Sequence, residues 1–155
     1  MRASAGRGCP QTLFCLVAAG TFGLDQLAKA AARARLEAGS SVPVLGKWLQ
    51  LTLTHNAGSA FGLVSGRWWL VAVGVLVCGA ILIYMLARGS RAASHGQVLP
   101  LGLVLGGSLG NLADRLRTGG VFDFVDLRVW PVFNVADMAI TVGVVVLAVG
   151  VMRRR

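Results

Sequence analysis

Charged side chains are scarce in this chain, and acidic ones are the scarcest. Lys, Arg, Asp and Glu together make up 14% of the 155 residues and only 6 are acidic, whereas 55% are hydrophobic. Soluble proteins are roughly 45–50% apolar, and so few charges cannot cover a globular surface. The composition excludes an ordinary soluble domain and indicates an integral membrane protein.

Histidine and cysteine are also scarce. His55 and His95 stand alone, and Cys9, Cys15 and Cys78 form neither a CxxC motif nor a Cys/His ligand spacing. An odd number of thiols, two of them in apolar sequence, favours buried and unreactive cysteines. We therefore expect no metal, no cofactor and no disulfide framework.

The net charge is +9, with 15 basic residues. These residues are spread between apolar segments rather than gathered in one patch, as a nucleic-acid site would require. We expect them to flank membrane spans, and we expect no nucleic-acid partner.

Four apolar segments are long enough to cross a bilayer, for which a helix needs about 20 residues. The expected spans are residues 11–31, 68–87, 96–113 and 133–152. The third is rich in small residues, which let helices approach closely, so we expect it to be the central packed span. These residues are Gly102, Gly106, Gly107, Ser108 and Gly110.

The first apolar segment has two interpretations. Arg2 and Arg7, the uncharged run 9–24 and small residues near 30–32 are also typical of a cleaved signal peptide. We favour a retained span, because cleavage would remove Asp25 and Lys29. These two are four residues apart on one helix face, either as an internal ion pair or facing a polar cavity beside the site.

Two segments alternate between apolar and polar residues, as half-buried strands do. They are residues 47–54 and 121–129, and the first is followed by Gly58 and Gly62, which permit a tight turn. Residues 32–47 are expected to be an exposed connection. The fold class is thus mostly α and integral to the membrane: one domain, residues 1–155, with four transmembrane helices and a small β-cradle.

Basic residues do not orient these spans. The termini and the 88–95 loop carry seven (Arg2, Arg7, Arg88, Arg91, Arg153, Arg154, Arg155), and the opposite face also carries seven (Arg33, Arg35, Lys47, Arg67, Arg115, Arg117, Arg128). The positive-inside rule therefore gives a tie. The acidic residues are not balanced in this way, because none lies on the side of the termini.

Residues 110–140 hold most of the acidic side chains, and two of them suggest a catalytic pair. Asp123 follows the third span and Asp137 opens the fourth, so antiparallel helices would bring them together at one membrane surface. Two close carboxylates share one proton. One can then act as general base for a water and the other as general acid, which is the chemistry of aspartic proteases.

Other interpretations remain open from spacing alone. The two carboxylates could pair with Arg115, Arg117 or Arg128, or Asp137 could cap a helix with Asn134. A small proton-coupled transporter would use acids as a relay, although no internal repeat is present. A non-catalytic membrane assembly factor would need neither carboxylate.

Five ordered motifs resemble those of one family. DQLAK (25–29), NAGSAFG (56–62), GNLADR (110–115), GGVFDF (119–124) and FNVADMAI (133–140) resemble, in order, the motif boxes of the lipoprotein signal peptidases, the type II bacterial signal peptidases. The resemblance implies an aspartic endopeptidase that removes the signal peptide from prolipoproteins by cleaving before a diacylglyceryl-modified cysteine. Lipid-modified prolipoproteins and membrane lipids would be its partners, and we expect a monomer.

The resemblance also implies a location and a set of site residues. Both termini would be cytoplasmic, with the β-cradle extracytoplasmic and the active site near the outer leaflet of the bacterial cytoplasmic membrane. Asp123 and Asp137 would be catalytic. Substrate-binding or supporting roles would fall to Asn56, Gly58, Asn111, Arg115, Asn134, Asp25, Lys29 and Asp114.

The sequence departs from the family pattern at two places. Only Leu63–Arg67 lies between the NAGSAFG box and the second span, where family members often carry a short surface helix. Ala28 stands where a hydroxyl residue is common. Asp126 has no place in the pattern and is expected to serve local structure.

Overall fold

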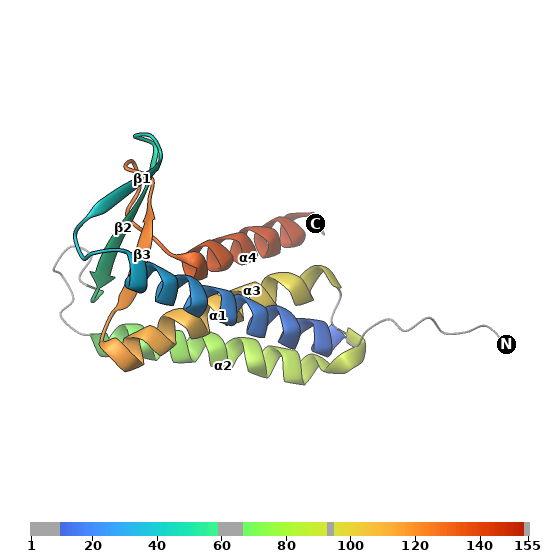
Figure 1. Cartoon of the computed structure of the whole chain (residues 1–155). Coiled ribbons are helices and arrows are strands. Elements are labelled where there is room, and N and C mark those ends of the chain that lie inside the picture. The colour runs from blue at the N-terminus through green and yellow to red at the C-terminus, as the bar shows by residue number, and fades with distance from the viewer. Residues whose placement is uncertain (1–9, 59–66, 93–94, 154–155) are drawn as a thin grey trace.

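A computed structural model describes residues 10–58, 67–92 and 95–153, and it has four long helices with a small sheet across one end (Figure 1). The helices are α1 (Pro10–Arg35), α2 (Arg67–Ala92), α3 (His95–Thr118) and α4 (Val135–Met152), and the strands are β1 (Ser41–Leu45), β2 (Leu49–Asn56) and β3 (Val121–Asp126). All four helices contain a segment long and apolar enough to cross a membrane. The predicted fold class is confirmed. The shortened segment Leu63–Arg67 and the turn at Gly62 fall largely outside the described residues.

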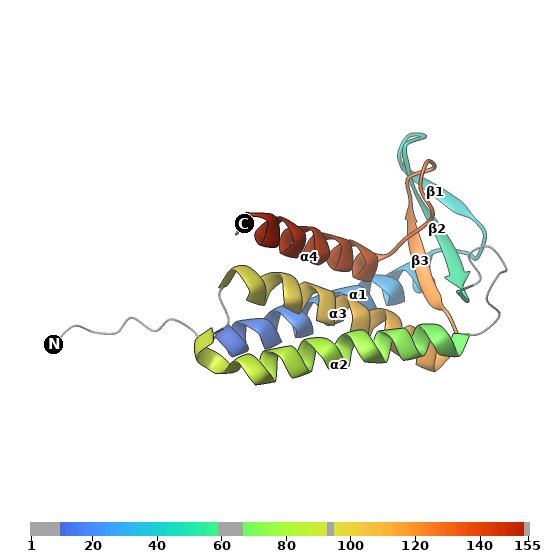
Figure 2. The ribbon, with the colours of Figure 1, turned by 180° about the vertical axis from the view of Figure 1, so that it is seen from behind.

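Helix α3 is the centre of the bundle and packs against each of the other three helices (Figure 2). A Cβ atom at Gly106 would collide with the carbonyl oxygen of Ala18 on α1. At Gly107 it would lie 2.6 Å from the carbonyl oxygen of Ala136 on α4. The small residues thus allow two backbones to contact α3 directly, as the sequence predicted.

Gly106→Ala is therefore expected to destabilise the bundle strongly. The added methyl group would meet backbone on α1, which cannot turn away as a flexible side chain can, and such overpacking costs about 1–3 kcal/mol or more. Gly20→Ala is the matched control, because nothing lies within 4 Å of a Cβ there. Thermal unfolding in detergent should show a lower Tm for Gly106→Ala only; equal Tm values would contradict the close approach of α1 and α3.

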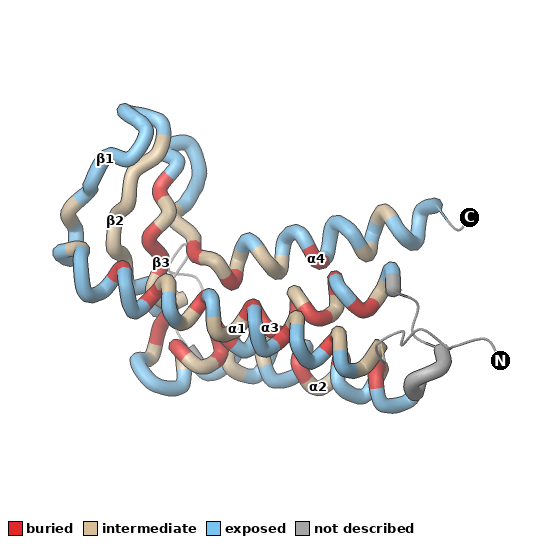
Figure 3. The backbone as a smooth tube through the Cα atoms, turned by 45° about the vertical axis from the view of Figure 1, so that its right-hand side comes forward, coloured by how far each residue is buried: buried red, intermediate tan, exposed pale blue. Residues whose placement is uncertain are grey.

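The outer surfaces of α2 and α4 are apolar and exposed, whereas the buried residues gather where the helices face α3 (Figure 3). Large side chains such as Leu76, Ile83 and Val145 are more than half exposed. A helix that is apolar on every side belongs in lipid or in a protein core. These surfaces therefore face hydrocarbon, and the bundle core is small.

The sheet is antiparallel in the order β1-β2-β3. The expectation that residues 32–47 form a plain connection is wrong, because β1 lies there and pairs with β2, Val42 opposite Leu51. Pro43 suits this position, since proline is tolerated on an edge strand. The second predicted strand region is confirmed but ends at Asp126.

The loop between β3 and α4 folds back onto β3 and so brings the start of α4 beside the strand. After β3 the chain loops back so that Phe133 and Val125 exchange backbone hydrogen bonds, with the Phe133 amide 3.0 Å from the Val125 carbonyl oxygen and the reverse contact at 2.8 Å. Residues that follow Phe133 are thereby held beside residues of β3. This return positions the site described next.

Candidate active site

Asn134 links the two predicted carboxylates. Its Nδ2 donates to Asp123 Oδ1 at 2.6 Å, and its Oδ1 accepts the backbone N–H of Asp137 at 2.9 Å. The Asn134 backbone N–H donates in turn to Asp137 Oδ2 at 3.3 Å, which completes a capping box at the start of α4. The predicted capping role of Asp137 is therefore confirmed, and the cap also brings Asp137 to Asp123.

The remaining carboxylate oxygens of the pair also accept amide donors. Asn111 Nδ2 donates to Asp137 Oδ1 at 2.8 Å, and Asn56 Nδ2 donates to Asp123 Oδ2 at 3.3 Å. Asn56 is held in this orientation by Gly58, whose N–H donates to Asn56 Oδ1 at 2.9 Å. Gly58 has φ 84°, which glycine adopts without strain. The two carboxylates thus receive donors from three different parts of the chain.

A buried ionic network lies beneath the pair. Lys29 Nζ contacts Asp25 Oδ2 and Asp114 Oδ2, each at 2.8 Å, and donates to Asn111 Oδ1 at 2.9 Å. An ammonium has three donors and no acceptor, so Lys29 fixes Asn111 with its NH₂ group toward Asp137. The interpretation of Asp25 and Lys29 as an internal ion pair is confirmed, and hydrogen bonds through Asn111 connect this pair to Asp137.

The network continues into α4 and β3. Asp25 Oδ1 accepts the Ala136 N–H at 2.9 Å in the first turn of α4, and Asp114 Oδ2 accepts the Phe122 N–H at 3.4 Å. The same charges therefore hold α1, α3, α4 and β3 together around the pair. Asp25 and Asp114 are buried and serve as structural acceptors.

Gln26 belongs to this network but was not predicted from the sequence. Its Nε2 donates to Asp114 Oδ1 at 3.1 Å, and its Oε1 accepts from Arg117 Nη1 at 3.1 Å. Its position next to Asp25, inside the first motif box, was the only available signal. Gln26 connects the buried charges to a basic residue at the end of α3.

No arginine forms a direct ion pair with Asp123 or Asp137 in the described part of the chain, although the charge of Arg115 acts on both from a greater distance. Within residues 10–58, 67–92 and 95–153, the ion pairs join Lys29 to Asp25 and Asp114, and Arg128 to Asp126. Arg115 is half-buried and donates to the backbone oxygen of Asn111 at 3.4 Å. The alternative in which arginine partners Asp123 or Asp137 directly is therefore wrong in this structure.

The environment of Asp123 favours its protonated form. Burial raises the pKa of Asp123 to about 6, assisted by the nearby charge of Asp137 and opposed by the donors on Asn134 and Asn56. Because this pKa lies above the ordinary value of 3.8, ionisation of Asp123 as the pH rises from 4 through 6 lowers folding stability, by about 3 kcal/mol when complete. A carboxyl group whose pKa is raised in this way is typical of functional sites.

Asp126 behaves differently and serves the loop after β3. Its Oδ1 accepts the Arg128 N–H at 2.8 Å, and its Oδ2 accepts the Thr52 hydroxyl at 3.0 Å. The Arg128 backbone hydrogen bond lowers the pKa of Asp126. The expectation that Asp126 supports local structure agrees with these contacts.

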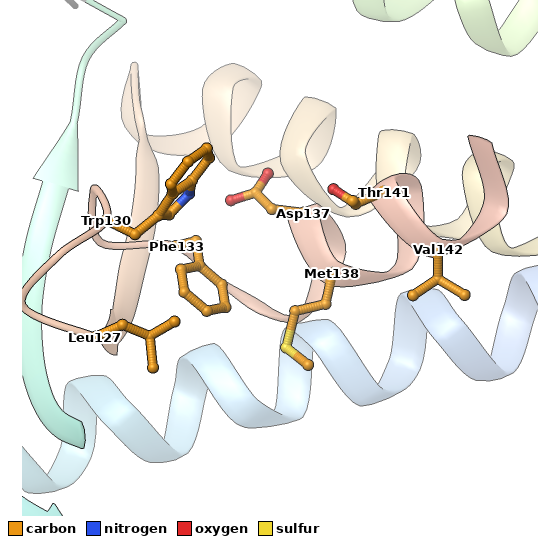
Figure 4. Close-up of a pocket in the computed structure, with 7 residues that line it drawn as sticks. All are labelled: Leu127, Trp130, Phe133, Asp137, Met138, Thr141 and Val142. Atoms are coloured by element: carbon orange, nitrogen blue, oxygen red, sulfur yellow. The ribbon is translucent and has the colours of Figure 1, made fainter. Parts of the chain in front are cut away.

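A pocket of about 400 Å³ opens beside Asp137 (Figure 4). It is lined by Leu127, Trp130, Phe133, Asp137, Met138, Thr141 and Val142. The lining residues are mostly apolar, and those with polar side-chain groups are Asp137, Thr141 and Trp130 with its indole N–H (Figure 4). One member of the pair, Asp137, therefore borders a space suited to an apolar ligand. In the described part of the chain, no group of three His, Cys, Asp or Glu residues could hold a metal.

Comparisons with known proteins agree on one family. Residues 17–153 match the profile of Signal peptidase (SPase) II. The chain is 48% identical to a lipoprotein signal peptidase of Moorella thermoacetica over 86% of this chain and 89% of the relative. It is 40% identical to one of Halothermothrix orenii over 80% and 84%.

Solved structures give the same answer for the fold. A bacterial membrane enzyme solved in meso at 1.9 Å resolution superposes with a TM-score of 0.83 at 26% identity, covering 92% of this chain and 94% of the other. A second, at 2.3 Å resolution, gives 0.79 at 26% identity, covering 90% and 87%. The motif resemblance, the profile match over nearly the whole length and the shared fold lead to one conclusion: this chain belongs to the signal peptidase II family.

Proposed function

We propose that this chain removes signal peptides from lipid-modified prolipoproteins, and that it does so as an aspartic endopeptidase with Asp123 and Asp137 as its catalytic residues. The observation that carries the proposal is the pair itself. Two carboxylates are joined through Asn134, neither forms a direct ion pair with a cation of the described residues, and Asp137 lines an apolar pocket.

The proposed reaction uses one proton held between the carboxylates. The ionised member takes a proton from a water as the water oxygen attacks the scissile carbonyl carbon, and the protonated member donates to the carbonyl oxygen. When the tetrahedral intermediate collapses, the C–N bond breaks, the amine nitrogen takes up the proton that the first carboxylate removed from the water, and a hydroxyl of the intermediate returns a proton to the second carboxylate. The raised pKa of Asp123 supports a role as the initial proton donor, leaving the base role to Asp137.

The surroundings of the pair support an apolar, membrane-bound substrate. The pocket beside Asp137 offers few polar groups, so the hydrophobic effect would provide most of the binding energy for acyl chains or for an apolar signal sequence. We place the sheet and the pair at the outer leaflet of a bacterial cytoplasmic membrane, with both termini in the cytoplasm, and we propose a monomer.

A transporter is the less favoured alternative. The acids of the network and the pair lie together at the end of the bundle that carries the sheet, rather than along a path through it. A proton relay across the bilayer would need acids near the midplane.

The proposal is tested with purified protein in detergent. We incubate the protein with a diacylglyceryl-modified prolipoprotein and, separately, with the same prolipoprotein without lipid. The masses of the products are then measured by mass spectrometry. We expect cleavage immediately before the modified cysteine and little cleavage of the unmodified chain. Equal cleavage of both substrates would refute recognition of the lipid. No cleavage of either would contradict the proposed function and favour the transporter or assembly-factor alternative.

A further inference from the structure

Four large apolar side chains project from one end of the sheet. Leu45 and Trp48 lie at the β1–β2 turn and are 65% and 69% exposed, and Val129 and Trp130 lie in the loop after β3 and are 82% and 68% exposed. The two segments are neighbours, because Gln50 pairs with Asp126 in the sheet register. We call these four residues the apolar tip.

The apolar tip lies to the side of the helix bundle, past α4 (Figures 1 and 3). The sheet crosses the end of the bundle and extends past α4 on the side away from α3, so that the tip projects beyond the helices (Figures 1 and 3). Val142 of α4 lines the same pocket as Trp130 of the tip and is itself more than half exposed. An exposed apolar cluster of this kind marks a contact surface, and the adjoining surface of α4 faces hydrocarbon.

The charges around the tip suit a lipid headgroup region. Lys47 Nζ lies 5.3 Å from the centre of the Trp48 ring, and Arg128 remains 54% exposed. Asp126, the acid beside them, is buried against Thr52 and Arg128. Tryptophan with adjacent Lys or Arg is the composition found at membrane–water interfaces, and the cations would meet anionic headgroups.

The loop is shaped so that its apolar residues project. Arg128 has φ 65°, an unusual conformation for a residue with a side chain. The Asp126 side chain stabilises this turn by accepting the Arg128 N–H. The exposed residues Val129 and Trp130 therefore follow a defined turn, which the buried side chain of Asp126 stabilises.

We propose that the apolar tip inserts into the headgroup–acyl boundary of the leaflet at the sheet end of the bundle, beside α4. Trp130 also lines the pocket at Asp137, so the tip and the pocket form one continuous apolar surface. Seated in lipid, the tip keeps bulk water from the mouth of the pocket and leaves it open to the bilayer. This inference does not depend on the proposed reaction.

Fluorescence of a single tryptophan tests the insertion. Replacing Trp68, Trp69 and Trp130 by Phe leaves Trp48 as the only reporter. The protein is reconstituted into vesicles of phosphatidylethanolamine and phosphatidylglycerol, with or without bromine on the acyl chains near the glycerol. Brominated lipid quenches tryptophan within the bilayer, and acrylamide quenches it from the aqueous phase. We expect the loss of Trp48 fluorescence to be severalfold larger with brominated lipid than with acrylamide.

The matched control places the reporter at the other end of the sheet. Glu37→Trp, in a chain whose four native tryptophans are Phe, reports from an exposed position near Leu53. We expect it to be quenched by acrylamide and little affected by brominated lipid. Equal acrylamide quenching of the two reporters would overturn the proposal. Protection of Trp48 without quenching by brominated lipid would also overturn it, and would indicate that a second copy covers the tip.

Discussion

Asp123→Asn and Asp137→Asn are each expected to lower kcat for cleavage of a lipid-modified prolipoprotein by about 10²–10⁴-fold, the usual contribution of general acid–base catalysis. Asparagine has nearly the size and polarity of aspartate, but it can neither accept nor release the shared proton. Asn134 and Asn111 can still donate to the remaining carbonyl oxygen at positions 123 and 137. The folded structure should therefore survive while activity is lost.

The control for this prediction is Asp126→Asn. Asp126 lies on the same strand as Asp123, but its partners are Thr52 and Arg128. Its replacement should leave kcat close to that of the wild type. Single-turnover cleavage gives the rates, and Tm in detergent verifies folding. Near-normal cleavage by either Asp123→Asn or Asp137→Asn would assign that aspartate a structural role and refute the mechanism.

Lys29→Met is expected to have the largest effect on stability. Lys29 is 3% exposed and is the cation for both Asp25 and Asp114. Removing one partner from a buried ion pair costs about 3–5 kcal/mol, because the remaining charge stays buried without compensation. Activity should fall as well, since Asn111 loses the donor that fixes its NH₂ group toward Asp137.

Two further variants separate this effect from a general loss of packing. Lys47→Met removes an exposed cation that contacts only the Trp48 ring among the described interactions, and surface changes of this kind stay within about 0.5 kcal/mol. Adding Asp114→Asn to Lys29→Met removes one of the uncompensated charges and should recover part of the lost Tm. If the double variant is no more stable than Lys29→Met, the loss does not arise from buried charge.

Hydropathy predicted the four spans because length and apolar content alone decide whether a helix can cross a bilayer. The same signal could not find β1: all five of its residues are exposed and it contains Pro43, so it carries no alternation of burial. Its pairing partner lies beyond a turn, and only the tertiary structure reveals the register.

The site was predictable where the motifs are specific and not elsewhere. The resemblance implied a pair of Asp123 and Asp137, which the structure places together through Asn134, and spacing suggested a cap at Asn134. Gln26 was missed, since a neutral polar residue on an apolar helix gives no periodic signal. The sequence also could not predict how each asparagine side-chain amide is oriented, because this depends on the donors that surround it in the folded structure. In this structure Lys29 sets Asn111, and Gly58 sets Asn56.

The claim that Asp123 and Asp137 act as one unit is tested most directly by titrating the carboxyl groups. The chain contains only five aspartates, so protein labelled with ¹³C at the aspartate carboxyl carbons gives a spectrum simple enough to follow against pH in detergent. Asp123→Asn identifies the signal of Asp123.

We expect the pKa of Asp123 to be about 6 and to fall in Asp137→Asn, because the charge of Asp137 contributes to the rise. The sign follows from repulsion between like charges, which disfavours the ionised form of Asp123. An Asp123 signal that titrates near 4, and at the same pH in Asp137→Asn, would mean that the two carboxylates ionise independently, in contradiction to a shared proton.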